Sequence, residues 1–263
     1  MTTRISQPTM FVVLGDSLAR PRVEDGLFEP DTYAFKLQGL LGPGFYVLNK
    51  ALGGNHIVQE NKDAQRIFHI QSTRATYFSI QIGIVDCTPR IFTEPEKQHL
   101  NTLSEKPLIG RWVKKWISSK SARRYEITRE RQISQTELPE FDQAYRKLVE
   151  NIRTLSPSKR IFAINIAYPG KLFIDRNYGV LENIKSFNAV IRQICSDNAD
   201  IMELVDVHAL TEKHNEYVLA DGHHVSRAVH DWLAAQISSR VLTIEDHSVS
   251  GLQGLVKSEK GAV

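Results

Sequence analysis

Cysteine is scarce in this sequence, which has Cys87 and Cys195 among 263 residues. Two cysteines cannot build the disulfide framework on which small secreted domains depend, so a reducing compartment is expected. Long apolar stretches are missing as well. The first ten residues, MTTRISQPTM, hold no apolar core of signal-peptide length, and no run approaches the length that spans a bilayer. We therefore expect a cytoplasmic protein with no membrane partner.

A dominant charge is also absent. Lys and Arg total 33 and Asp and Glu total 30, a net charge of +3. Residues 111–131 alone carry eight basic and two acidic residues, so the rest of the chain has a net charge of 3 − 6 = −3. The two tryptophans in this segment are expected in a core or an interface, and stacking aromatics are not interleaved with its charges. We therefore expect no nucleic-acid partner.

Short apolar runs alternate with helical periodicity along the chain. This alternation predicts a parallel sheet covered on both faces, a three-layer α/β/α fold with a five-stranded, flavodoxin-like sheet in one domain over residues 1–263. The expected strands are residues 11–14, 45–48, 75–82, 160–167 and 201–207, and the expected helices are residues 32–41, 57–70, 141–155, 178–195 and a last one from about 225.

Two segments break this alternation. Residues 91–136 are too long for an ordinary loop and should have structure of their own, with one short helix around 109–117. This basic insertion is interpreted as a solvated charged face, a lid over a site, or a platform for an anionic partner. Residues 248–263 lack periodicity and are expected to form a flexible tail.

Parallel sheets place their sites at the carboxyl ends of the strands. The first predicted strand ends in Gly15-Asp16-Ser17, and Asp221-Gly222-His223-His224 directly precedes the last helix. A serine hydroxyl is a poor nucleophile until a base takes its proton. A histidine can do so, and a carboxylate on its other nitrogen fixes the tautomer. Ser17, His224 and Asp221 are therefore candidate catalytic residues.

This pattern resembles the SGNH hydrolases, a branch of the GDSL esterases and lipases. Gly15-Asp16-Ser17-Leu18 is similar to their first block, and Asp221 and His224 are similar to their last, Asp-x-x-His. Residues 49–54, NKALGG, resemble the second block, so the resemblance implies an oxyanion hole made by the backbone amides of Ser17 and Gly54.

The third block differs from the family pattern Gly-x-Asn-Asp. The chain has Gly83-Ile84-Val85-Asp86, so Val85 stands where the family has an oxyanion-binding Asn. Losing one oxyanion donor typically costs about 2.7–4 kcal/mol. Three alternatives remain open. The two backbone amides suffice, the reaction is not ordinary ester hydrolysis, or another group serves, for which the candidates are Arg20, Asn55, His56 and Arg90.

Three arginines lie on the candidate site loops. Arg20 and Arg22 follow Ser17 closely, and Arg90 follows the third block. Guanidinium groups suit a carboxylate or a phosphate. We assign Arg20, Arg22, Asn55 and Arg90 to substrate binding, and expect a substrate that is acidic or phosphorylated.

Other polar residues near the site receive structural interpretations. Asp86 is expected to anchor its own loop, Cys87 to be packed and inert, and His223 to be an exposed loop residue. We predict no metal site, because adjacent histidines such as His223 and His224 rarely converge on one ion. No cofactor is expected.

The resemblance implies a serine hydrolase that cleaves carboxylic esters through an acyl-enzyme. Its substrates would be small molecules or glycans that carry acyl or O-acetyl groups. Two alternatives remain open: an acyltransferase with the same triad, and a non-catalytic ligand-binding relative. The sequence does not indicate an oligomeric state.

Overall fold

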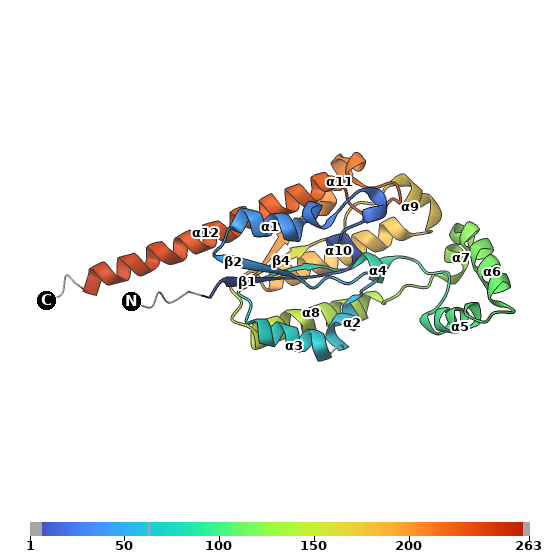
Figure 1. The fold of residues 1–263 in the computed structure, drawn as a ribbon, viewed down its shortest axis with the longest axis horizontal. Helices are drawn as coiled ribbons and strands as arrows, with labels where there is room; N and C mark the ends of the chain where they lie inside the picture. Colours follow the sequence, from blue (N-terminus) through green and yellow to red (C-terminus); the bar gives the residue numbers. More distant parts are fainter. Residues whose placement is uncertain (1–6, 63, 260–263) are drawn as a thin grey trace.

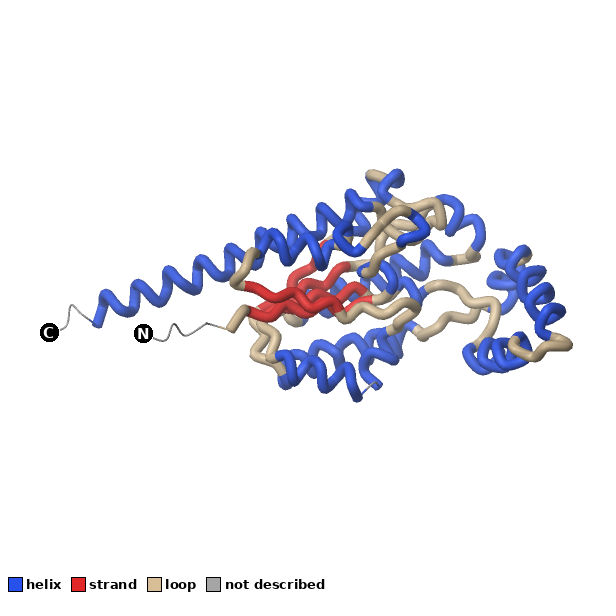
Figure 2. The backbone as a smooth tube through the Cα atoms, in the orientation of Figure 1, coloured by secondary structure: helices blue, strands red, loops and turns tan. Residues whose placement is uncertain are grey.

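Five parallel strands form the centre of the computed structural model, which describes residues 7–62 and 64–259. The strands run in the order β2-β1-β3-β4-β5, and Figure 2 shows them between two helical layers. The predicted three-layer α/β/α architecture with a flavodoxin-like sheet is therefore confirmed. The strands are β1 (Thr9–Gly15), β2 (Phe45–Asn49), β3 (Tyr77–Gln81), β4 (Arg160–Ile164) and β5 (Met202–Val205).

Successive side chains of the central strands point to opposite faces, and both faces are buried. In β1, Val12 and Leu14 belong to one apolar cluster while Phe11 and Val13 belong to the other. A strand covered on both faces is apolar at nearly every position, which explains why the sequence shows continuous runs there rather than alternation.

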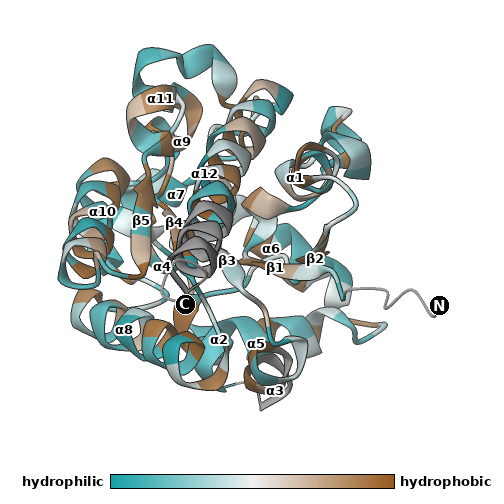
Figure 3. Cartoon of the chain, turned by 90° about the vertical axis from the view of Figure 1, so that its left-hand side faces the viewer, coloured by the Kyte–Doolittle hydropathy of each residue, from teal (hydrophilic) through white to brown (hydrophobic). Residues whose placement is uncertain are grey.

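Helices cover each face of this sheet. On one face lie α1 (Tyr33–Leu41) and the long α12 (Arg227–Glu259), which pack against each other. Figure 3, viewed from the left-hand side of Figure 1, shows α8 and α10 on the opposite side of the sheet from α1 and α12. The opposite layer consists of α2 (Ile57–Lys62), α3 (Ala64–Thr73), α8 (Leu138–Leu155) and α10 (Val180–Asp197).

The predicted helices follow the apolar periodicity of the sequence. In α8, Phe141, Tyr145, Leu148 and Ile152 recur every three or four residues and are fully buried. The helix predicted over 57–70 is divided between α2 and α3, and residue 63 lies outside the described residues. Short helices follow three of the strands: α4 (Ile84–Cys87), α9 (Lys171–Arg176) and α11 (Val207–Lys213).

The basic insertion contains three helices rather than one: α5 (Glu94–Ser104), α6 (Gly110–Ala122) and α7 (Arg124–Arg131). They lie beyond the carboxyl ends of the strands, at the opposite end of the molecule from both termini (Figure 1). An antiparallel bridge between Arg90 and Ile133 closes the insertion at its base, with a 2.7 Å hydrogen bond from the Arg90 amide. Trp112 does not lie in a core of the described chain, because it is 71% exposed.

The last helix extends beyond the residues whose apolar periodicity predicts it. Residues 248–259, predicted as an aperiodic tail, continue the backbone of α12 as helix, and residues 260–263 lie outside the described residues. None of the helices in the described part of the chain combines the length and apolar character needed to cross a bilayer.

Candidate active site

Ser17 stands two residues beyond the end of β1, at the carboxyl end of the sheet. The Asp16 Oδ1 accepts a 2.9 Å hydrogen bond from the Leu18 amide and so caps the single turn of helix that begins at Ser17. This turn packs tightly on the strand. A Cβ on Gly15 would lie 3.1 Å from the Ala19 Cβ, so glycine lets the chain reverse here without displacing its neighbours.

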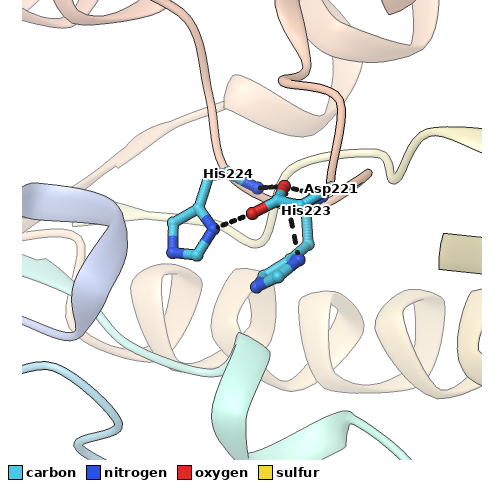
Figure 4. A group of neighbouring side chains, drawn as sticks. All are labelled: Asp221, His223 and His224. Carbon is cyan, nitrogen blue, oxygen red and sulfur yellow. Dashed lines mark hydrogen bonds and ion pairs between the residues drawn. The ribbon is translucent and has the colours of Figure 1, made fainter. Parts of the chain in front are cut away.

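Asp221 and His224 lie on a tight turn before α12. Gly222 adopts a φ of +83°, which favours glycine. One Asp221 oxygen accepts backbone hydrogen bonds from His223 at 3.1 Å and His224 at 3.0 Å. The other oxygen lies 2.5 Å from the His224 Nδ1 (Figure 4). The three-residue spacing therefore lets one carboxylate both shape the turn and orient the imidazole.

The second ring nitrogen of His224 faces the candidate nucleophile. Its Nε2 lies 2.9 Å from the Ser17 Oγ, and His224 is 5% exposed. The structure thus brings together the three residues that the sequence predicts as catalytic. A neutral imidazole held in this way can accept the serine proton and share the resulting charge with Asp221.

Hydrogen bonds keep Asp221 ionised. Its partial burial acts to raise the pKa of the carboxyl group, but the bonds from the His224 side chain and the two backbone amides together hold that pKa well below its usual range. Arg22 adds a contact of 3.3 Å to Asp221. The carboxylate is therefore charged at neutral pH.

His223 is not the exposed loop residue that the sequence predicts. Its ring stacks on Phe173, with centroids 4.7 Å apart, and burial lowers its pKa to about 4. His223, Asp221 and His224 offer ligand atoms within 4.8 Å of one another. However, the facing atoms of Asp221 and His224 already bind each other, so a cation here would disrupt the contact that orients His224.

Two fully buried carboxyl groups, those of Asp16 and Asp86, support the loops of the site. Asp86 accepts hydrogen bonds from the Ile57 amide at 3.2 Å and the Thr136 hydroxyl at 2.7 Å, and so anchors the third-block loop. Burial raises the pKa of Asp86 to about 6 and that of Asp16 to about 8. The Oδ2 of Asp16 has no partner among the described residues, as suits a carboxyl group that is neutral at pH 7.

A cavity of about 300 Å³ opens beside Ser17. Val85 lies in its wall, so no side-chain amide is offered at the position where the related family has Asn. Its lining consists of Ser17, Ile84, Val85, Thr88, Arg90, Arg124, Phe173, Arg176, Asn177, Asp221 and His223.

Among the predicted substrate-binding residues, Arg90 lines this cavity. Arg22 instead forms ion pairs with Asp25, at 2.8 Å, and with Asp221. Asn55 is 1% exposed and donates hydrogen bonds to the Gly15 carbonyl and to Glu60. These hydrogen bonds hold the end of β1 in place.

The second-block loop lies beside the cavity rather than in its lining. Gly54 has a φ of +72°. The neighbouring Gly53 approaches Arg20, because a Cβ built on Gly53 would lie 3.4 Å from the Arg20 Nη1. No hydrogen bond joins the amide of Ser17 or Gly54 to another described residue. Ser17 lines the cavity and Gly54 does not.

Arg124 and Arg176 line the cavity but were not predicted from the sequence. Arg124 comes from the basic insertion and Arg176 from the end of α9. Neither lies in a family block, and the basic composition of residues 111–131 was the one available signal.

Comparison with known proteins gives a family and a fold. Residues 13–232 match the profile described as "GDSL-like Lipase/Acylhydrolase family". No curated protein sequence matches the chain.

Solved structures share the fold at low sequence identity. A lipase/acylhydrolase from Enterococcus faecalis has a TM-score of 0.55 at 14% identity, covering 89% of this chain and 95% of that one.

Two further structures are similar in the same way. One is a catalytic mutant, serine to alanine, of Axe2, an acetylxylan esterase from Geobacillus stearothermophilus. Its TM-score is 0.53 at 19% identity, covering 87% of this chain and 93% of that one. The other is an α/β hydrolase enzyme from the metagenome of Lake Arreo, Spain. Its TM-score is 0.56 at 16% identity, covering 86% of this chain and 91% of that one.

The neutral form of Asp16 predicts a pH dependence of stability. Between its ordinary pKa of 3.8 and its folded pKa of about 8, the folded state holds a proton that the unfolded chain has lost. The free energy of unfolding should therefore fall as pH rises, by up to about 1.4 kcal/mol per pH unit. Asp16→Asn should make this slope shallower.

Urea unfolding from pH 5 to pH 8 measures this slope. The exposed Asp175→Asn serves as the control and should leave the wild-type slope unchanged. Equal slopes in Asp16→Asn and in the wild type would show that Asp16 is ionised in the folded protein.

The turn at Gly222 gives a second expectation. A Cβ at this position would lie 2.8 Å from the Phe173 backbone nitrogen, in addition to the unfavourable φ. Gly222→Ala should destabilise the protein by about 1–3 kcal/mol. Gly179 has a φ of +71° but open space around it, so Gly179→Ala isolates the backbone cost and should lose only about 1 kcal/mol. Equal losses in chemical denaturation would contradict the role of the close contact.

Proposed function

The chain belongs to the GDSL-like lipase/acylhydrolase family, and from that membership we propose that it is a serine esterase that uses Ser17, His224 and Asp221 as a catalytic triad. The observation that carries the proposal is the continuous contact from Asp221 through His224 to Ser17. Ordinary buried histidines also form hydrogen bonds, but this one joins a partly exposed serine in a cavity wall to an ionised carboxylate.

The proposed reaction has two halves. His224 Nε2 removes the Ser17 proton as Oγ attacks the ester carbonyl, and Asp221 stabilises the imidazolium that forms. His224 then donates that proton to the departing alcohol, which leaves an acyl-enzyme on Ser17. Water, deprotonated by His224, attacks this ester and releases the acid, and the proton returns to Ser17.

The oxyanion would be held by backbone groups in this mechanism. The amides of Ser17 and Gly54 are free to donate, and the helical turn after Asp16 begins at Ser17. Val85 offers no donor from the cavity wall. We therefore propose an oxyanion hole with two backbone donors and one position that is apolar where related enzymes have an amide.

The expected substrates are small esters. A cavity of about 300 Å³ is at the lower end of the range for small-molecule sites. A similar fold occurs in a protein described as an acetylxylan esterase, which supports an O-acetyl or other short acyl ester, on a sugar or a comparable alcohol, as the substrate class.

Replacement of the nucleophile tests the mechanism. Ser17→Ala should lower kcat on para-nitrophenyl acetate by roughly 10⁴-fold or more, because no other group can form the acyl-enzyme. It should also abolish labelling by a serine-directed fluorophosphonate. Ser118→Ala, an exposed serine on α6, is the matched control and should react like the wild type. Retained turnover or labelling in Ser17→Ala would refute the assignment.

Adding back the missing amide tests the oxyanion hole. Val85→Asn places a donor in the cavity wall and should raise kcat on the aryl acetate by roughly tenfold or more, up to the 10²–10³-fold effect of one such donor. Val85→Leu has nearly the same shape as Asn without a donor and controls for packing. A Val85→Asn rate no higher than that of Val85→Leu would show that the oxyanion does not lie beside residue 85.

A further inference from the structure

Three arginines converge on the cavity beside Ser17, each from a different part of the chain. Arg90 follows α4, Arg124 opens α7 in the insertion, and Arg176 ends α9. Within the described residues, none of the three forms an ion pair with a carboxylate. Arginines elsewhere on the surface do: Arg131 pairs with Glu96, Arg146 with Asp197, and Arg153 with Asp200.

Arg90 is held in place by a neutral partner. Its Nη2 donates a 2.8 Å hydrogen bond to the Val85 carbonyl, while its Nε is buried and has no partner in the described chain. Asp86 is the acidic group that acts on Arg90 most strongly. However, its oxygens accept from Ile57 and Thr136, and no hydrogen bond or ion pair joins it to Arg90 in the described chain. A buried guanidinium donor therefore remains unused.

Arg124, like Arg90, is held by neutral partners. It donates to the Asn177 side-chain oxygen and to the Pro89 carbonyl. Burial and the neighbouring charges of Arg90 and Arg176 lower the pKa of Arg124 to about 10. Like charges held together in a half-buried site are unfavourable until an anion joins them.

Arg176 distinguishes a binding role from a structural one. Arg90 and Arg124 each fasten a loop through backbone carbonyls, which alone would explain their positions. Arg176 is exposed, forms no hydrogen bond or ion pair within the described part of the chain, and still lines the cavity. Holding a loop in place does not explain why Arg176 lines the cavity. A shared anionic ligand explains the position of all three arginines.

We propose that the ester substrate carries an oxyanion group, a carboxylate or a phosphate, and that Arg90, Arg124 and Arg176 bind this group while Ser17 attacks the ester. Guanidinium forks match the geometry of such groups. The limited volume of the cavity places the anion within a few bonds of the ester carbonyl. This inference rests on the proposed esterase function. It makes the basic insertion, through Arg124, a determinant of specificity.

Matched ester pairs test the proposal. On the acyl side, para-nitrophenyl hydrogen glutarate is compared with its methyl ester. On the alcohol side, para-acetoxybenzoate is compared with methyl para-acetoxybenzoate, and para-acetoxyphenyl phosphate extends the test to phosphate. We expect kcat/KM to favour the anionic member of at least one pair by roughly tenfold to a hundredfold, as charge-assisted hydrogen bonds provide. The pair that responds shows on which side of the ester the anion lies.

Three variants identify the residues responsible. Arg176→Gln breaks no hydrogen bond or ion pair within the described chain and should lower the anionic-to-neutral ratio of kcat/KM by roughly tenfold. Arg124→Gln should lower it similarly, with circular dichroism to check that the fold survives. Arg123→Gln is the control, because Arg123 is exposed, lies next to Arg124 and is absent from the cavity lining. Its ratio should match that of the wild type, which excludes an effect of net charge.

A binding measurement separates this inference from the esterase assignment. Calorimetry with Ser17→Ala and para-acetoxybenzoate, para-acetoxyphenyl phosphate or para-nitrophenyl hydrogen glutarate should show binding that Arg176→Gln weakens in the same background. Neutral esters hydrolysed with no anionic preference in any pair would overturn the anion site and leave the esterase intact. If no ester is hydrolysed, the esterase assignment fails, and the calorimetry alone decides whether the arginines bind an anion.

Discussion

The contact between His224 and Ser17 is the constraint around which this fold is arranged, because it joins residues 207 positions apart in the sequence. The parallel sheet makes that contact possible. It places the end of β1 at the same edge as the turn that precedes α12, and α1 packs along α12 behind both. Short-range features then set the geometry on each side. Asp16 caps the turn at Ser17, and Asp221 closes the turn at His224. A shift of either turn would separate the two groups, although the sheet itself would be unchanged.

Electrostatics divide the site into two parts. On one side, Asp221 is stabilised as an anion by backbone amides, His224 and Arg22, so negative charge lies behind the imidazole. On the other side, Arg90, Arg124 and Arg176 line the same cavity as Asp221, but none of them forms an ion pair with Asp221 or with another carboxylate of the described chain. Charge in the proposed reaction would therefore develop between a fixed carboxylate and a cluster of cations.

Much of the fold and the candidate triad could be predicted from the sequence for a physical reason. A strand buried on both faces is apolar at nearly every position, as residues 11–14 are. Asp-x-x-His lies on one tight turn, so its local spacing implies its local geometry. The residues that line the cavity were harder to predict from the sequence. Arg22 and Arg90 are both near the family blocks in sequence, yet Arg22 pairs with acidic neighbours while Arg90 lines the cavity. Charge alone does not indicate which partner an arginine will find, and Arg124 lies in a segment whose position depends on tertiary packing.

The position of the basic insertion follows from how its base is fixed. The bridge between Arg90 and Ile133 joins its two ends, and the Thr136 hydroxyl binds the buried Asp86, which also holds the amide of Ile57 at the start of α2. One buried carboxyl group therefore connects α2, the third-block loop and the return of the insertion to the sheet. An insertion anchored in this way need not close as a lid to affect the site, because its base and the cavity wall are the same piece of structure. Asp86 thus links the base of the insertion to the loop that carries Val85 and Arg90, and so to both the oxyanion side and the proposed anion site.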